Sequence, residues 1–224
     1  MSSLGFFWVV SNDTTQQKLL KWSMILAKRH YPELPHCVAT SDNSFSCDAQ
    51  MIYFEPTRDD PSHESVYALH LSPFDTTYFL CNRSMIIFRF DHLLSGVPFQ
   101  TSKHFFEENN DPHGMEEDNA IVVYDKHIIK QFHSWLSTQK IDWIPWRPRH
   151  ILHEWRKHYP DYYVNEKLMI DSEANKKHFM KAFDIQSRRE LCGVPLPLWF
   201  RFPIFDLDTS PDVFYNMVIK DKTH

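Results

Sequence analysis

The chain has 224 residues, a length that fits one large domain or two small ones. Hydrophobic residues make up 42% of it and aromatic residues 15%, which indicates a globular protein with a full core and excludes a disordered chain. The net charge of −5 argues against a protein built wholly for nucleic acid, because such domains usually have a pI above about 9.

The charge is distributed unevenly along the chain. Residues 41–120 contain fourteen acidic and four basic side chains, whereas residues 121–165 contain seven basic and four acidic ones. An acidic middle followed by a basic stretch indicates a polarised surface. The sequence has only four glycines and lacks the glycine-rich motifs of phosphate loops, dinucleotide-binding folds and nucleophile elbows. These classes of enzyme are therefore unsupported.

Targeting signals are not evident in the sequence. The longest apolar run, "FFWVV", is far shorter than the roughly 20 residues that a membrane-spanning helix needs. The N-terminus has neither a basic region nor a small-residue cleavage site typical of a secretory signal. The four cysteines form no CxxC pair, so we expect reduced thiols in a soluble, intracellular protein of the cytoplasm or nucleus that is not bound to a membrane.

The first elements predicted are a strand and a helix. The run "GFFWVVS" is apolar and rich in aromatic and β-branched residues, which predicts a buried strand. Thr14 and Gln17 have the spacing of a capping box, and Pro32 marks the end of the helix that would follow. The apolar stripe of this helix consists of Leu20, Met24, Ala27 and Tyr31.

The pattern changes between residues 37 and 100. Short runs at 49–56, 65–72, 77–82 and 85–91 are rich in β-branched and aromatic residues and are separated by turn residues. This pattern is typical of a small, mainly antiparallel sheet. Residues 104–120 are polar, acidic and rich in turn residues, which predicts a mobile acidic loop or an internal boundary.

The second half of the chain alternates between strand and helix patterns. A strand is expected over 120–125, followed by a helix over 126–137, a helix over 148–159 and a helix over 172–191. An extended, proline-containing tail and a short helix would complete the chain. We therefore expect a single α+β or mixed α/β domain over residues 1–224. Its small, mainly antiparallel sheet would be flanked by four to five helices.

The stretch "WIPWRPRHILHEWRKHYP", residues 143–160, combines tryptophans with basic side chains. On a helix, Ile151, Leu152 and Trp155 share one face and the cations lie mostly away from it. This arrangement could bind a phosphate backbone or a protein partner, and it could equally be a helix packed on the core with a solvated basic face. The candidate binding residues are Trp143, Trp146, Arg147, Arg149, Arg156 and Lys157.

A second candidate site lies in "IFDLDTSPDVFYNMVIK". Asp206 and Asp208 would lie on the same side of a strand and could bind a hard cation such as Mg²⁺ or Mn²⁺. The order of hydrophobic strand, DxD, turn and helix resembles the first catalytic motif of archaeo-eukaryotic primases and of the polymerase domains of bacterial end-joining ligases. That resemblance implies metal-dependent nucleotidyl transfer. Alternatively, the two aspartates cap the following turn and helix.

No complete catalytic motif is present, so the sequence does not decide whether the chain is an enzyme. Its content of Trp, Tyr, Phe, Met and Arg favours a non-catalytic binding or assembly module, with a protein partner or nucleic acid. The alternatives are a Mg²⁺-dependent nucleotidyl-transfer domain that uses Asp206 and Asp208, and a metal-dependent nuclease. The oligomeric state is not predicted.

Overall fold

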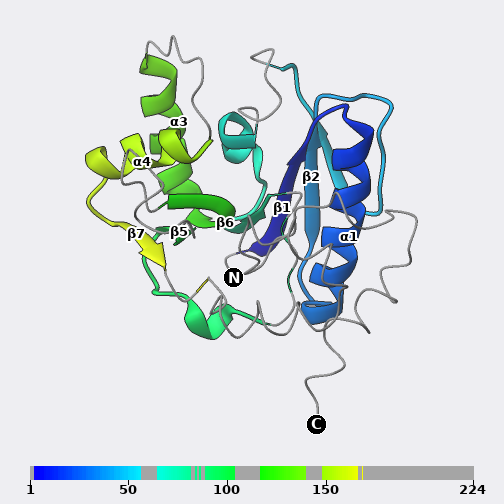
Figure 1. Ribbon diagram of the computed structural model, residues 1–224, viewed down its shortest axis with the longest axis horizontal. Helices are drawn as coiled ribbons and strands as arrows, with labels where there is room; N and C mark the ends of the chain where they lie inside the picture. Colours follow the sequence, from blue (N-terminus) through cyan, green and yellow to red (C-terminus); the bar gives the residue numbers. More distant parts are fainter. Residues whose placement is uncertain are drawn as a thin grey trace, which may run out of the picture.

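The protein is built around one mixed sheet with helices on both faces (Figure 1). A computed structural model describes residues 3–56, 65–81, 84, 86, 89–103, 117–139, 148–165 and 168. The strands are β1 (Leu4–Val10), β2 (His36–Thr40), β3 (Gln50–Tyr53), β4 (Thr76–Leu80), β5 (Phe99–Lys103), β6 (Glu117–Asp125) and β7 (Tyr162–Asn165). The helices are α1 (Thr14–His30), α3 (Lys126–Thr138) and α4 (Pro148–His158), with the 3-10 helices η1 (Ala68–Leu71) and η2 (Asp91–Leu93).

The seven strands lie in the order β3-β2-β1-β4-β6-β5-β7. Within the described residues, four neighbouring pairs of strands are parallel and the two pairs that involve β6 are antiparallel. The fold is therefore mixed α/β, and the prediction of a small, mainly antiparallel sheet is only partly right. The relative direction of the strands was predicted wrongly, because a parallel strand that is buried on both faces has the sequence of a short apolar run. A buried antiparallel strand has the same pattern.

Several segments differ from their predicted structure. The run 65–72 forms a helical turn and η1 instead of a strand. The sequence analysis missed β2, β5 and β7, which have four or five residues each. Strands this short contain too few residues to show a period above the background of the chain.

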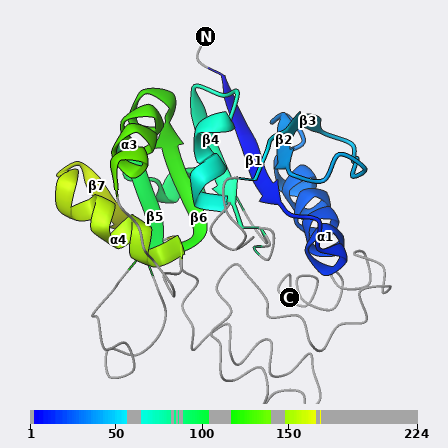
Figure 2. The same cartoon turned by 90° about the horizontal axis from the view of Figure 1, so that it is seen from above.

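Strand β1 lies in the middle of the sheet and is covered on both sides. Phe6, Trp8 and Val10 belong to the core cluster beneath α1, while Phe7 and Val9 belong to the cluster on the opposite face. Alternate residues of a strand point to opposite faces. Because both faces of the sheet are covered here, all five side chains are buried. Figure 2 shows α1 and α3 on the two sides of the sheet.

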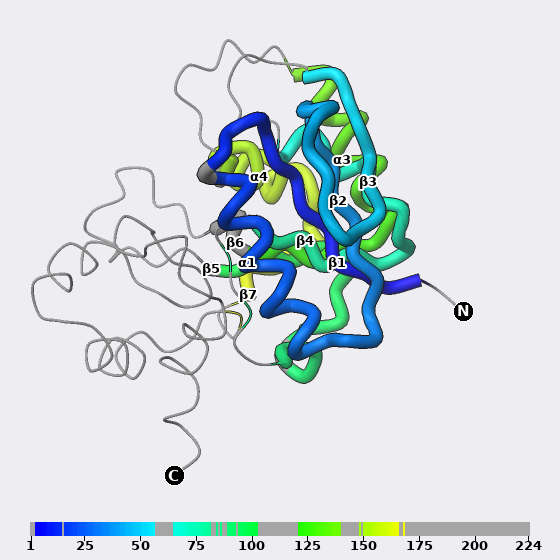
Figure 3. The backbone as a smooth tube through the Cα atoms, turned by 90° about the vertical axis from the view of Figure 1, so that its right-hand side faces the viewer, coloured from blue at the N-terminus to red at the C-terminus, as the bar shows by residue number. Residues whose placement is uncertain are grey.

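Helix α1 confirms the predicted apolar stripe. Leu20, Met24, Ala27 and Tyr31 all lie in the cluster between α1 and the sheet. The cap differs from the prediction, because Asp13 accepts the hydrogen bond from the Gln16 amide at 2.9 Å and Thr14 is already helical. Seen from the side in Figure 3, the chain runs along β1, turns at the carboxyl end of this strand and returns through α1.

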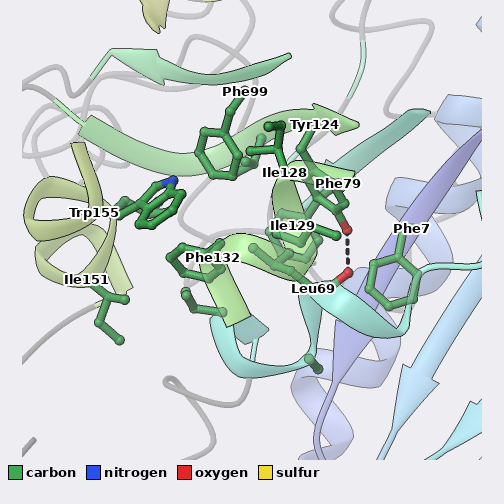
Figure 4. Packing of buried hydrophobic residues seen from close by; sticks show 14 of the residues in the cluster. Phe7, Leu69, Phe79, Phe99, Tyr124, Ile128, Ile129, Phe132, Ile151 and Trp155 are labelled. Carbon is green, nitrogen blue, oxygen red and sulfur yellow. Dashed lines mark hydrogen bonds between the residues drawn. The ribbon is translucent and has the colours of Figure 1, made fainter. Parts of the chain in front are cut away.

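Helices α3 and α4, both predicted from their periodicity, cover the other face of the sheet. Ile128, Ile129 and Phe132 of α3 meet Ile151 and Trp155 of α4 in one cluster (Figure 4). In the same cluster the Tyr124 hydroxyl donates a hydrogen bond to the Leu69 carbonyl at 2.7 Å, which ties β6 to η1.

The remaining predictions are tested only in part. Residues 117–120 of the predicted acidic loop begin β6, and residues 104–116 lie outside the described residues. The helix expected over 172–191 and the tail after it also lie outside them. In the part of the chain that the structure describes, no helix has the length and apolar character needed to cross a membrane. The predicted cellular compartment stays a prediction.

Candidate functional site

The strand order reverses between β1 and β4. From β1 the chain moves outward to β2 and β3 on one side, and it then returns to place β4 on the other side of β1. In open α/β sheets, ligands bind outside the carboxyl ends of the strands at such a switch point. The candidate functional residues are therefore those just after β1, β2 and β4.

This region, the switch-point edge, consists of the polar residues that follow these three strands together with the first turn of α1. Ser11 and Thr40 are buried, whereas Asn12 and Asp13 are exposed. Asp42 is half-buried. The edge thus combines buried hydroxyl groups with accessible amide and carboxylate groups. The full set is Ser11, Asn12, Asp13, Gln16, Gln17, Thr40, Asp42, Ser44 and Cys81.

Hydrogen bonds hold the edge together. Gln17 donates from Nε2 to Asp42 Oδ2 at 2.8 Å and to the Ser11 carbonyl at 3.4 Å. Ser44 donates to Asp42 Oδ1 from its amide at 2.9 Å and from its hydroxyl at 2.6 Å. One glutamine therefore connects α1, the end of β1 and the loop after β2, so the three segments present a common surface.

The electrostatics of the edge centre on Asp42. Hydrogen bonds from Ser44 and from Gln17 favour the ionised carboxylate and hold the pKa of Asp42 below its ordinary value. Near neutral pH this group is therefore a charged acceptor. Asp13 contributes a second, exposed carboxylate that also caps α1.

The end of β4 is fixed differently, through Ser84 and the interior of α1. The Ser84 amide donates to the carbonyl of Cys81, the residue directly after β4, at 2.7 Å. The Ser84 carbonyl accepts a 2.6 Å hydrogen bond from the Ser23 hydroxyl, and that hydroxyl accepts one from Trp8 Nε1 at 3.0 Å. Ser84 is thus attached to α1 and, through Ser23, to β1.

The arrangement is suited to a ligand rich in hydroxyl groups. Hydroxyls both donate and accept hydrogen bonds, and the edge offers acceptors in Asp13 and Asp42 and both functions in the Asn12 amide. The Asn12 side chain is exposed, which places its amide at the surface of the edge.

The structure describes only some of the residues predicted from the basic stretch. Trp143, Trp146 and Arg147 lie outside the described residues, and Arg149 is described only as part of α4. Arg156 and Lys157 are exposed in the last turn of α4, where Lys157 pairs with Glu154 at 2.6 Å. The packing of Ile151, Leu152 and Trp155 is confirmed, and the binding role of the cations stays a prediction.

The predicted metal ligands Asp206 and Asp208 also lie outside the described residues. Within the described ranges, no group of three or more His, Cys, Asp and Glu side chains is arranged to hold a metal ion. Mg²⁺ or Mn²⁺ binding at Asp206 and Asp208 therefore stays a prediction.

Comparison with known proteins shows the class of fold. No protein-family model and no curated protein sequence matches the chain. Among solved structures, it is similar to the galactosyltransferase LgtC, which was solved with donor and acceptor sugar analogues. The TM-score is 0.59 and the identity 10%, over 98% of this chain and 96% of LgtC. It is also similar to the glycosyltransferase GlyE of Streptococcus pneumoniae TIGR4, with a TM-score of 0.56 and 12% identity over 98% of this chain and 61% of GlyE. The chain thus has a glycosyltransferase-like fold and spans about three fifths of GlyE.

This finding corrects the function expected from the sequence. The similar structures are sugar-transfer enzymes, so the interpretation as a non-catalytic binding or assembly module in a nucleic-acid or nucleoprotein complex is wrong. The finding also contradicts the two alternatives, the nucleotidyl-transfer domain and the nuclease. The resemblance of the DLD stretch to primases was local, whereas the similarity to glycosyltransferases covers nearly the whole chain.

The sequence analysis missed the switch-point edge completely. A signal was present in "WVVSND" and "VATSDNS", where polar residues directly follow a buried strand. It went unnoticed because β2 was not recognised, and without β2 there is no reason to place Asp42 beside Ser11.

Proposed function

We propose that the protein transfers a sugar from a nucleotide-linked donor to an acceptor hydroxyl, and that the donor binds at the switch-point edge. In this reaction the bond between the anomeric carbon of the sugar and a phosphate oxygen breaks, and the nucleotide leaves with the electron pair. The acceptor oxygen forms the new bond to the anomeric carbon and loses its proton. The observation that carries the proposal is the polar edge at the strand-order reversal of a glycosyltransferase-like fold.

The edge fits the non-phosphate part of such a donor. Ribose and sugar rings present neighbouring hydroxyl groups, which a fixed carboxylate such as Asp42 accepts well. Asn12 can donate to and accept from a base or a sugar. Because Gln17 and Ser44 hold Asp42 in place, little ordering would accompany binding.

The phosphates of the donor need positive charge. Asp206 and Asp208 remain the predicted ligands of a Mg²⁺ or Mn²⁺ ion that would supply it. Titration calorimetry with Mn²⁺ tests this part separately, since Asp206→Asn combined with Asp208→Asn should abolish binding. Unchanged Mn²⁺ binding in the double variant would remove these residues from the proposal.

The proposed function is tested first by binding. Thermal unfolding is followed with sugar nucleotides, free nucleotides and free sugars, in the presence of Mg²⁺ or Mn²⁺. A ligand at about 100 times its Kd stabilises a protein by roughly 2.7 kcal/mol, which is easily measured as a shift in Tm. We expect a shift with at least one sugar nucleotide and none with free sugars. The absence of a shift with every sugar nucleotide and free nucleotide would contradict the proposal.

A further inference from the structure

Ser23 of α1 is a buried polar residue in an otherwise apolar layer. Its side chain is fully buried, on the helix side that packs against Trp8. Serine is less favourable than alanine inside a helix, and a buried hydroxyl is tolerated only when it is hydrogen bonded. The Ser23 hydroxyl is therefore expected to have hydrogen-bond partners inside the protein.

One partner lies in β1 and the other follows β4, and these two strands flank the switch point. Trp8 of β1 donates to the Ser23 oxygen at 3.0 Å. The Ser23 hydroxyl in turn donates to the carbonyl of Ser84, four residues after the end of β4, at 2.6 Å. Trp8, Ser23 and Ser84 are all fully buried, so water does not compete for these hydrogen bonds.

Ser84 is in turn bonded to a residue of the switch-point edge. The Ser84 amide donates to the Cys81 carbonyl at 2.7 Å, directly after β4. Cys81 is half-buried, so the accessibility of its thiol reports on how firmly Cys81 and Ser84 are held.

We propose that Ser23 is a positioning residue, which holds Ser84, and through it Cys81, in place relative to β1 and so shapes the donor site. The inference rests on the proposed function for its effect on catalysis, but the anchoring itself does not. Ser23 would not touch the donor. It would act through Ser84, in the way that supporting hydrogen bonds commonly hold the residues of a site.

The test compares two serine-to-alanine variants. Ser23→Ala removes the proposed anchor. Ser72→Ala is the matched control, because Ser72 is also buried and shares a 2.6 Å hydrogen bond with Thr77, on the opposite face of the sheet. Alkylation of Cys81 by iodoacetamide is followed by peptide mass spectrometry, which separates this thiol from the other three cysteines. Donor KM and kcat are measured on the same preparations.

In Ser23→Ala we expect Cys81 to be alkylated about tenfold faster, as the loss of a buried hydrogen bond would allow. We also expect donor KM to rise, with recovery in Ser23→Thr, which keeps the hydroxyl. Ser72→Ala should alter neither value. Should Ser23→Ala fail to fold, Ser23→Cys takes its place, since a thiol keeps the volume and is a weaker hydrogen-bonding group.

An unchanged rate of Cys81 alkylation in Ser23→Ala would contradict the anchoring role of Ser23. An equal increase of that rate in Ser72→Ala would contradict it too. Faster alkylation with unchanged donor kinetics overturns the positioning role. The two proposals fail separately. A wild-type protein that turns over no sugar donor refutes the proposed function and the catalytic effect of Ser23. The alkylation rates alone still decide whether Ser23 holds Ser84 and Cys81 in place.

Discussion

The Nε2 atom of Gln17 lies 2.8 Å from Oδ2 of Asp42, and this hydrogen bond joins the first turns of α1 to the loop that follows β2. The two residues are 25 positions apart in the sequence, and the pairing of β1 with β2 brings them together. The hydrogen bond makes the Asp42 carboxylate a fixed acceptor at the place where the strand order reverses.

The first prediction concerns Asp42. Replacing it with Asn removes the charge and one acceptor, since the amide cannot accept from both Ser44 and Gln17. We expect Asp42→Asn to weaken the binding of a sugar nucleotide, measured as a smaller ligand-induced shift in Tm. Asp48→Asn is the control, because Asp48 is in the same connection between β2 and β3 but pairs with Lys28 in an exposed ion pair. Equal effects of the two substitutions would argue against a specific role of Asp42.

The second prediction concerns Gly5 in β1. A Cβ atom at this position would lie 2.5 Å from the ring of Phe74, which is itself buried. We expect Gly5→Ala to lower the free energy of unfolding by about 1–3 kcal/mol, as overpacking usually does. Urea denaturation measures the change.

Gly96 provides the comparison. It has a φ of +77° and open space around its Cα, so only backbone strain opposes a side chain there. Gly96→Asn should therefore be milder than Gly5→Ala, because Asn tolerates this backbone conformation. A Gly5→Ala protein as stable as the wild type would show that Phe74 moves aside freely.

These examples show what the sequence can and cannot predict. The periodicity of 14–30 and 126–138 identified α1 and α3, because each helix buries a continuous stripe over several turns. Strand direction was not predictable in the same way, since the run at β4 is equally apolar whether its neighbour is parallel or antiparallel. The switch-point edge depends on that direction, so it could not be placed from the sequence alone.

The third prediction concerns His36 at the start of β2. Burial, with a smaller contribution from Lys28, lowers the pKa of His36 to about 4, so the folded protein keeps this imidazole neutral. Between pH 6.5 and 4 the unfolded chain binds a proton here that the folded protein does not bind. Stability should therefore fall as the pH decreases through this window.

Urea midpoints measured from pH 7.5 to 4 for the wild type and for His36→Gln check this effect. The variant should lose less stability on acidification than the wild type. His92 of η2 is exposed, so His92→Gln serves as the control for replacing a histidine at the surface and should follow the wild-type curve. Identical pH dependence in the wild type and His36→Gln would contradict the prediction.

The fourth prediction concerns the contact between η1 and α3. The rings of His70 and His133 lie with their centroids 3.7 Å apart. Burial lowers the pKa of His70, and the neighbouring His133 adds to this effect, while a hydrogen bond with the Tyr67 carbonyl opposes it. Replacing His133 with Phe keeps the ring contact and removes the charge. The pKa of His70, followed by NMR, should then rise towards its ordinary value, and an unchanged or lower pKa would count against the charge contribution of His133.

The most direct test of the central claim is turnover. Purified protein is incubated with a panel of sugar nucleotides, Mg²⁺ or Mn²⁺ and mixed sugar acceptors, and the released nucleotide and the glycosylated product are measured together. We predict release of nucleotide matched by product formation for at least one donor, with a clear loss of both in Asp42→Asn. No release from any donor, by a protein whose folding is confirmed by its urea transition, would contradict a sugar-transfer function for this protein.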